Sequence, residues 1–379
     1  MSRLAPVGGP RAGMLACICD PQFEAPANDN AGARPNALPL ALGFAFAVLA
    51  QTLAAGVLPL AGALLAPRPS LATLPFAALM LGAALASFPA SFLGDAFGRR
   101  TGFALGASLG IAGGALLAVG LLQRQFSFAC LGALWLGMAQ GFSFFYRHEA
   151  AASAGRPAAA AAGVMAGGLL AALAGPTLAT LAEGLFSPAF LVGSAVLAAL
   201  AHTASLGVAV RLAPDARPWL SMVTPGPLAA ILAPTVVGML AWFGMSLVMA
   251  GAPLALLGCG VGEGAVFGFI ALHVAAMYAP AAPLALLDGR IASQVLTPPR
   301  LAFAGLVLVA LAFPLQMSGE PALLAAALVL VGAGWSVATV GCTGWLHQVA
   351  KPGRLALALH DGALFTAAII GAALAGRLF

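Results

Sequence analysis

From Leu38 onward, the chain alternates long apolar runs with short breaks that contain proline, glycine or charged residues. The runs reach about 20 residues, the length that a helix needs to cross the hydrocarbon core of a bilayer. A helix satisfies its own backbone hydrogen bonds in hydrocarbon, whereas a single strand does not. We expect eleven transmembrane helices, over residues 39–66, 70–93, 101–123, 126–146, 157–182, 186–211, 228–252, 263–287, 300–317, 321–346 and 355–377. The predicted fold class is an all-α polytopic membrane protein.

Composition and charge support the membrane assignment. Charged residues make up 7% of the 379 residues and hydrophobic residues 62%, whereas a soluble domain carries about 25% charged residues. With the N-terminus in the cytoplasm, all of the 16 basic residues lie at inner ends except Arg68, Arg124 and Arg377. Basic residues concentrate on the cytoplasmic side of membrane proteins. We therefore expect a multi-pass protein of a bacterial inner membrane with a cytoplasmic N-terminus.

An internal repeat divides the predicted helices into two groups. Pro89 precedes Arg99 by ten residues in the second helix, and Pro280 precedes Arg290 by ten in the eighth. The shift is 280 − 89 = 191 residues. Applied to the sixth helix, this shift places a twelfth helix beyond Phe379, so we expect that helix to be missing. Two six-helix groups in parallel repeat are the plan of a large class of secondary transporters.

The predicted domain organisation follows from this repeat and from local composition. The first residues are rich in proline, glycine, asparagine and alanine and show no helical period, which is typical of disorder. We expect a disordered cytoplasmic tail, an N-terminal six-helix half, a central cytoplasmic loop and a C-terminal half of five helices, over residues 1–37, 38–211, 212–227 and 228–379.

A charged loop between the second and third predicted helices carries the most specific motif. It reads Asp95-Ala-Phe-Gly98-Arg99-Arg100 and resembles the signature D-(R/K)-x-G-R-(R/K) of the major facilitator superfamily (MFS). The resemblance extends over about residues 38–379. It implies two six-helix halves related by a pseudo-twofold axis, and in this loop a latch that locks the halves together on the cytoplasmic side. The alternative is a loop whose arginines only set the orientation.

The chain departs from the MFS pattern at several positions. Ser91 replaces the usual leading glycine of the loop motif, and Ala96 replaces the basic residue after the aspartate. Gly137 occupies the position in the fourth helix at which many proton-coupled members carry an arginine. The second copy of the loop motif keeps only D-G-R, at residues 288–290. The missing arginine argues against a proton-coupling device that is familiar in the family.

The fifth predicted helix contains Gly167, Gly168, Gly175 and Pro176. These residues resemble a glycine-proline motif seen most often in exporters of the superfamily, which favours export. In the alternative interpretation, the glycines only let helices pack closely, as small residues do in any membrane bundle. Pro176 then adds a bend, because proline removes one backbone hydrogen bond.

Polar residues inside the predicted helices are candidates for the substrate cavity or for coupling, since an ionisable group in hydrocarbon is costly. The candidates are Gln51, Arg147, Glu149, His273, Tyr278, Trp335, His360 and Asp361. His360 and Asp361 form an adjacent pair in which a carboxylate and an imidazole could carry a proton. Two alternatives stay open: Arg147 and Glu149 as residues of an interfacial salt bridge, and His273 as a hydrogen-bonded packing residue.

These features predict a secondary active transporter that moves a small molecule by alternating access. We expect the transporter to be coupled to protons and to favour export over import. We also expect it to be a monomer that contacts membrane lipid. The chain has no G-x-x-x-x-G-K-[ST], H-E-x-x-H or G-x-S-x-G motif, which argues against an ATP-driven pump or an intramembrane hydrolase. We expect no enzyme activity, no cofactor, no metal site and no nucleic-acid partner.

Two other hypotheses are compatible with the sequence. The protein could be a non-transporting relative that acts as an assembly factor or sensor. Three features favour this hypothesis: the missing twelfth helix, the absent arginine of the fourth helix and the degraded second loop. A truncated gene fragment would explain the missing helix.

Overall fold

The computed structural model describes residues 37–378 except 153, 214–226, 288–295 and 350–351. Within those residues it contains twelve α-helices and no strand. The helices are α1 Ala37–Leu65, α2 Leu74–Phe97, α3 Arg99–Leu122, α4 Phe126–Ala152, α5 Pro157–Phe186, α6 Val192–Ala209, α7 Leu232–Gly258, α8 Glu263–Tyr278, α9 Ala281–Leu287, α10 Pro298–Gln316, α11 Pro321–Val349 and α12 Arg354–Leu378. The predicted tail up to residue 36, and most of the predicted central loop, lie outside the described residues.

Eleven segments of the described chain are long and apolar enough to cross a membrane, as the sequence predicts. The predicted span over residues 263–287 consists of two helices, α8 and α9, which are separated at Pro280. Proline has no N–H, and its ring clashes with the carbonyl four residues earlier, so helices break or kink at this residue. The two pieces still form one apolar span, over residues 268–286.

The fourth helix is longer than predicted. The sequence predicts an end at residue 146, whereas α4 continues to Ala152. No proline or glycine follows Tyr146 before that end, so no residue of low helix propensity interrupts the backbone hydrogen bonds. Arg147, His148 and Glu149 are therefore residues of a continuous helix.

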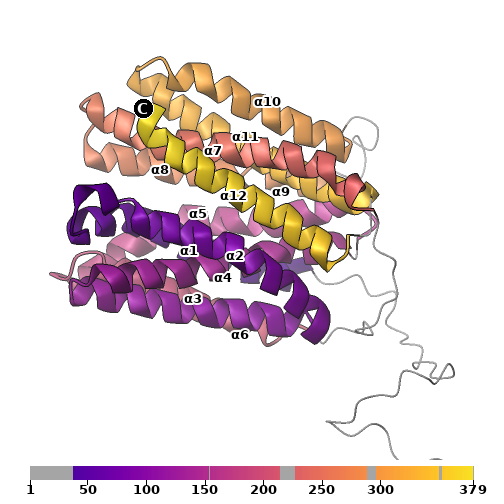
Figure 1. Cartoon of the computed structure of the whole chain (residues 1–379), viewed down its shortest axis with the longest axis horizontal. Helices are drawn as coiled ribbons and strands as arrows, with labels where there is room; N and C mark the ends of the chain where they lie inside the picture. Colours follow the sequence, from indigo (N-terminus) through magenta and orange to yellow (C-terminus); the bar gives the residue numbers. More distant parts are fainter. Residues whose placement is uncertain (1–36, 153, 214–226, 288–295, 350–351, 379) are drawn as a thin grey trace, which may run out of the picture. The chain divides into compact units, whose positions relative to one another are not determined.

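The helices form two groups in the order of the chain. We call α1–α6 the N-terminal set and α7–α12 the C-terminal set. Close packing within a set joins, for example, α3 to α4 and α10 to α11. The sets meet where α2 packs against α12, where α5 packs against α8, α9 and α11, and where α4 touches α11. Figure 1 shows yellow α12 running beside indigo α2, in agreement with these contacts. The residue boundaries of the two predicted halves stay a prediction.

Glycines set the closest approaches between helices. A Cβ at Gly137 on α4 would collide with the backbone carbonyl of Leu79 on α2, so even an alanine would not fit. This contact explains why no arginine stands at residue 137, since the position lies between two helix backbones. Gly305 on α10 approaches Ala338 on α11 in the same way, as small residues do in membrane bundles.

Successive spans alternate in direction, which places most of the basic residues at one end of the bundle. This arginine-rich end comprises the last turns of α2, α4, α6, α9 and α11 and the first turns of α1, α3, α5, α7, α10 and α12. The described basic residues at the ends of the helices there are Arg99, Arg100, Arg156, Arg211, Arg300 and Arg354, against Arg68, Arg124 and Arg377 at the opposite end. The predicted asymmetry therefore holds for the described residues, and its assignment to the cytoplasm stays a prediction.

Candidate functional site

Arg147 on α4 connects three helices from a buried position, with 1% of the residue exposed. Its Nη2 donates to Oδ1 of Asp361 on α12 at 2.6 Å, and its Nε donates to Oγ1 of Thr343 on α11 at 3.0 Å. Its Nη1 donates to the Phe144 carbonyl of its own helix at 2.9 Å. The guanidinium thus ties the N-terminal set to the C-terminal set.

Two histidines extend this contact toward the arginine-rich end. His148 Nε2 lies 3.1 Å from Asp361 Oδ1, and His148 Nδ1 lies 3.1 Å from His347 Nε2 on α11. A carboxylate only accepts hydrogen bonds, so neutral His148 donates through Nε2 and accepts at Nδ1 from His347. We call Arg147, His148, His347 and Asp361 the buried ion array.

His360 does not pair with its neighbour Asp361. Adjacent residues of a helix point about 100° apart, and the His360 ring faces α7 instead, with Nδ1 2.8 Å from Thr235 Oγ1. That hydroxyl donates to the Ile231 carbonyl at 2.7 Å and so accepts from the imidazole. The imidazole partner of Asp361 is therefore His148. No three histidine, cysteine or acidic side chains of the described residues are arranged to hold a metal ion.

Burial makes the array sensitive to the loss of any partner. The side chains of Arg147 and Asp361 are 1% and 0% exposed. Removal of one member of a buried ion pair leaves an uncompensated charge and costs about 3–5 kcal/mol. Asp361 Oδ2 also has no hydrogen-bond partner among the described residues. The array is a strong tie in this conformation, and a change in its charge would weaken that tie.

Aromatic rings from both sets pack together beside the array. We call them the aromatic cluster, which consists of Phe44 on α1, Phe144 on α4, Trp242 on α7, Tyr278 on α8, Trp335 on α11 and Phe365 on α12. The Phe144 ring centroid lies 5.3 Å from that of Trp242 and 5.6 Å from that of Phe365. The guanidinium carbon of Arg147 lies 5.0 Å from the same ring. Phe144 therefore joins the cluster to the buried ion array.

Two buried polar atoms, one in the aromatic cluster and one on the same face of α4 as Phe144, have no partner among the described residues. Trp335 Nε1 is buried and has no hydrogen-bond partner within the described part of the chain, whereas Trp242 Nε1 donates to Thr339 Oγ1 at 3.2 Å. Gln140, one turn before Phe144 on the same face of α4, has a buried Oε1 that also lacks a described partner. A buried polar atom left unsatisfied costs about 1–3 kcal/mol. Trp335 Nε1 and Gln140 Oε1 are therefore buried polar atoms without a described partner.

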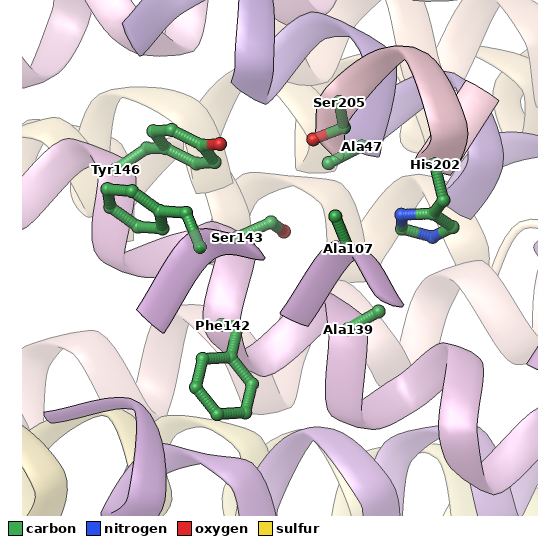
Figure 2. A pocket seen from close by; sticks show the side chains of 9 residues that line it. Ala47, Ala107, Ala139, Phe142, Ser143, Tyr146, His202 and Ser205 are labelled. Atoms are coloured by element: carbon green, nitrogen blue, oxygen red, sulfur yellow. The ribbon is translucent and has the colours of Figure 1, made fainter. Parts of the chain in front are cut away.

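A small cavity lies inside the N-terminal set, between α1, α3, α4 and α6, and Figure 2 shows the side chains around it. Its volume of about 10 Å3 is room for about one water molecule, which is too little for an organic substrate. Tyr146 OH and His202 Nδ1 belong to its lining and have no partner among the described residues. A Cβ at Gly43 would lie 2.7 Å from the Tyr146 hydroxyl oxygen, so this glycine leaves space for the ring. The cavity suits a bridging water, away from the aromatic cluster.

Comparison with known proteins identifies the family. No family model matches the chain. The riboflavin transporter RfnT of Brucella anthropi is 31% identical over 366 residues, which cover 92% of this chain and 90% of that transporter. The structure of the MFS proton:xylose symporter XylE matches with a TM-score of 0.65 at 13% identity, over 89% of this chain and 86% of that chain. The chain belongs to the major facilitator superfamily.

A second solved structure shares the MFS fold. The human organic anion transporter MFSD10 matches with a TM-score of 0.68 at 16% identity, over 89% of this chain and 91% of that chain. These relatives confirm the family and the fold class that the loop motif and the helix pattern predict. The MFS protein described here is a multi-pass membrane transporter and not an enzyme.

The MFS loop motif connects helices within the N-terminal set. Arg99 Nη1 lies 3.3 Å from Glu149 Oε1 on α4, and Arg99 Nη2 donates to the Ala213 carbonyl after α6 at 3.4 Å. Gly98, between α2 and α3, has a φ of 83°, a backbone conformation that glycine adopts without strain. The Asp95 side chain lies outside the described residues. A latch between the two sets that uses this loop stays a prediction.

Ser91, where this MFS chain departs from the usual glycine, contacts the other set. Its hydroxyl donates to the Arg354 carbonyl at the start of α12 at 2.7 Å. Gly344 on α11 approaches Ala158 near the start of α5 so closely that a Cβ at Gly344 would lie 2.5 Å from the alanine methyl. Together with the buried ion array, these contacts hold α2, α4, α5, α11 and α12 together at the arginine-rich end.

The glycines of α5 differ in their surroundings. Gly168 faces the Tyr278 ring on α8, where a Cβ would lie 2.5 Å from the nearest ring atom, and Gly167 lies against the backbone of α1. A Cβ at Gly175 would have ordinary van der Waals contacts, the nearest at 3.7 Å. The helix continues through Pro176 without a break. Gly167 and Gly168 thus allow close packing, and a role in export stays a prediction.

The remaining candidates lie in different places. His273 is buried in the C-terminal set and donates through Nδ1 to the Leu328 carbonyl at 2.6 Å, which agrees with the alternative of a packing residue. Gln51 is half-buried on α1. Tyr278 and Trp335 are members of the aromatic cluster, with ring centroids 6.1 Å apart.

Sequence reasoning missed two of the four members of the array. His148 and His347 were not among the candidates, because their partners lie 213 and 199 residues away in the chain. The sequence does contain a usable signal. The chain has five histidines, and an ionisable residue inside a membrane span is a candidate for a functional role. Phe144 and Trp242 were missed as well, since aromatic residues are common in any apolar core.

Proposed function

We propose that this MFS protein is a secondary transporter of a small, planar, heteroaromatic molecule of the flavin class. The observation that supports the proposal is the aromatic cluster, to which both helix sets contribute rings. A substrate site shared by the two sets is what alternating access requires. The relative RfnT is named a riboflavin transporter, so riboflavin is the probe for the tests below.

A flavin matches the chemistry of the cluster. On binding, ring–ring contacts between the two sets would be replaced by contacts between the fused rings of the flavin and the rings of the cluster. Each such contact contributes about 0.5–1.5 kcal/mol of binding free energy beyond the buried area. The flavin's carbonyl oxygens and ring nitrogens would accept from Trp335 Nε1, and its imide N–H would donate to Gln140 Oε1. Neither of these two atoms has a partner among the described residues. Binding would therefore satisfy polar atoms that are costly to leave buried.

Alternating access is the proposed mechanism. We assign the arginine-rich end to the cytoplasm of a bacterial cell, because basic residues concentrate on that side. At this end, the Arg147–Asp361 ion pair and the Ser91–Arg354 hydrogen bond join the two sets. These contacts would hold the cytoplasmic side closed in the present conformation. Rocking of the sets about the aromatic cluster would break them and open that side.

Protons are the proposed coupling ion and export is the proposed direction. Coupling to protons is supported by His148, His347 and Asp361, which meet where the two sets join. Export is supported by the resemblance of the α5 glycine-proline segment to the motif of exporters. Riboflavin movement in right-side-out and inside-out vesicles under the same imposed pH gradient tests the direction. Accumulation in right-side-out vesicles only would contradict export.

Riboflavin binding tests the assignment of the aromatic cluster. Purified protein in detergent would be titrated with riboflavin, and the dissociation constant obtained from the quenching of tryptophan fluorescence. Trp335→Phe keeps an aromatic ring and removes the Nε1 donor. We expect it to weaken binding about two- to tenfold, the equivalent of one hydrogen bond of about 0.5–1.5 kcal/mol.

Trp345→Phe is the matched control for this experiment. Trp345 also lies on α11, but its ring packs against Phe303 of α10, with centroids 5.9 Å apart, outside the cluster. We expect this variant to bind riboflavin like the wild-type protein. The absence of saturable quenching in the wild type, or an equal loss of affinity in both variants, would contradict the assignment.

A further inference from the structure

The buried ion array contains a connected row of titratable groups, which a purely mechanical tie between helices would not need. We propose that His347, His148 and Asp361 form a proton path from the arginine-rich end to the Arg147–Asp361 ion pair. A proton that reaches Asp361 releases Arg147 and so frees α4 from α12. The inference rests on the proposed transport function and names the groups that couple transport to protons.

Burial increases along this path. His347 lies in the last turn of α11 and is half-buried, whereas His148 and Asp361 are 2% and 1% exposed. Water at the arginine-rich end can therefore exchange a proton with His347, while Asp361 is reached through the two imidazole rings.

The hydrogen bonds allow one proton to pass without leaving charge on either histidine. An incoming proton adds to Nδ1 of His347, and the proton on its Nε2 moves to Nδ1 of His148. The proton on Nε2 of His148 then moves to Oδ1 of Asp361. Each transfer follows a contact of 3.1 Å. Both histidines end neutral, with the proton on the opposite nitrogen, and one proton has moved from water to the carboxylate. The same transfers in reverse release the proton from Asp361 to water at the arginine-rich end, which is the direction that proton-driven export needs.

Protonation of Asp361 changes the charge balance at Arg147. Before the transfer, carboxylate and guanidinium compensate each other in a buried site. Afterwards Arg147 keeps only neutral partners within the described chain, the Thr343 hydroxyl and the Phe144 carbonyl. An unpaired buried charge costs several kcal/mol, which drives the guanidinium toward water at the arginine-rich end. This movement separates α4 from α11 and α12.

Among the described residues, Asp361 is the carboxylate that is bonded to Arg147. Other charged or titratable residues on the helices around the path include Tyr146 and Glu149 of α4, Arg99 and Arg100 of α3, Arg156 before α5, Cys342 of α11, Arg354 and His360 of α12, and Asp95 of α2, whose side chain lies outside the described residues. Glu149 pairs with Arg99 at 3.3 Å. α7 presents the Thr235 hydroxyl, which is bonded to His360 Nδ1, and the His360 ring lies against the His148 ring, with centroids 6.0 Å apart.

Two assays on the full-length protein in liposomes separate this inference from the proposed function. The first measures exchange of labelled for unlabelled riboflavin at equal pH, which needs the conformational change but no net movement of protons. The second measures net riboflavin movement driven by an imposed pH gradient. The variants are His148→Gln and His347→Gln, with His273→Gln as the matched control, a buried histidine outside the path.

We expect both path variants to lose gradient-driven riboflavin movement about tenfold or more and to lose much less of the exchange at equal pH, since a positioned proton-transfer group contributes about 10²–10⁴-fold. Asp361→Asn, which mimics the protonated carboxyl group and lacks the ion pair with Arg147, should also lose gradient-driven movement. His347→Gln is decisive if a buried variant fails to fold, because His347 is half-buried and is not part of the ion pair. Unchanged gradient-driven movement in His347→Gln, or an equal loss in His273→Gln, overturns the inference. A wild-type protein without riboflavin exchange overturns the proposed function instead.

Discussion

Removal of either member of the Arg147–Asp361 pair should destabilise the protein, and removal of both should restore most of the stability. The two side chains are 1% and 0% exposed, and Nη2 and Oδ1 are 2.6 Å apart. Arg147→Met leaves a buried carboxylate without its cation, and Asp361→Leu leaves a buried guanidinium without its anion. Each should lower the free energy of unfolding by about 3–5 kcal/mol. The double variant buries no charge, and apolar replacement of a whole buried pair is often neutral or stabilising.

Equilibrium unfolding in mixed detergent and SDS micelles would measure these differences in a double-mutant cycle. The Arg99–Glu149 pair is the control, because its side chains are 17% and 15% exposed at an N–O distance of 3.3 Å. A pair that water reaches contributes about 0–1 kcal/mol. The reasoning is refuted if the double variant is as unstable as the sum of the two single variants. Equal coupling energies in the two pairs would refute it as well.

Three other substitutions test the packing and the loop motif. Gly168→Ala should lower the free energy of unfolding by about 1–3 kcal/mol, because its Cβ would lie 2.5 Å from the Tyr278 ring. Gly175→Ala should be tolerated. Equal melting temperatures of the two variants in detergent would contradict this difference in packing. Gly137→Arg, which introduces the arginine of many MFS members, should give no monodisperse protein in gel filtration, and a folded variant would show that the α2–α4 contact is looser than described. Asp95→Asn should keep the topology, measured by cysteine labelling from each side, and slow riboflavin exchange, whereas unchanged exchange would reduce the loop to an orientation signal.

The membrane spans could be predicted from the sequence because each depends on a local apolar run. The one break inside a span also has a local cause, at Pro280. The end of α4 was placed too early, since a change from apolar to charged residues after Tyr146 looks like the membrane surface. The partners of Arg147 and His148 come from α11 and α12 and bury these side chains inside the bundle. Hydropathy does not reveal such partners.

The candidate site could be predicted only in part. Arg147 and Asp361 could be predicted as candidates, because an ionisable residue in a membrane span is energetically costly and usually functional. Adjacency in sequence suggested His360 as the proton partner of Asp361, yet neighbouring helical residues point in different directions. His148 took that place from another helix, 213 residues away. The steric reason for glycine at residue 137 could not be predicted either, since the Leu79 carbonyl that excludes a side chain there belongs to a different helix.

We propose that this MFS protein transports a flavin through the aromatic cluster between its two helix sets. The most direct test is the exchange of labelled riboflavin in liposomes that contain the wild-type protein, Trp335→Ala or Trp345→Ala. We expect saturable exchange in the wild type and competition by lumichrome, which has the flavin rings without the side chain. We also expect a loss of exchange in Trp335→Ala but not in Trp345→Ala. Wild-type liposomes that exchange riboflavin no faster than empty liposomes would refute flavin transport by this protein.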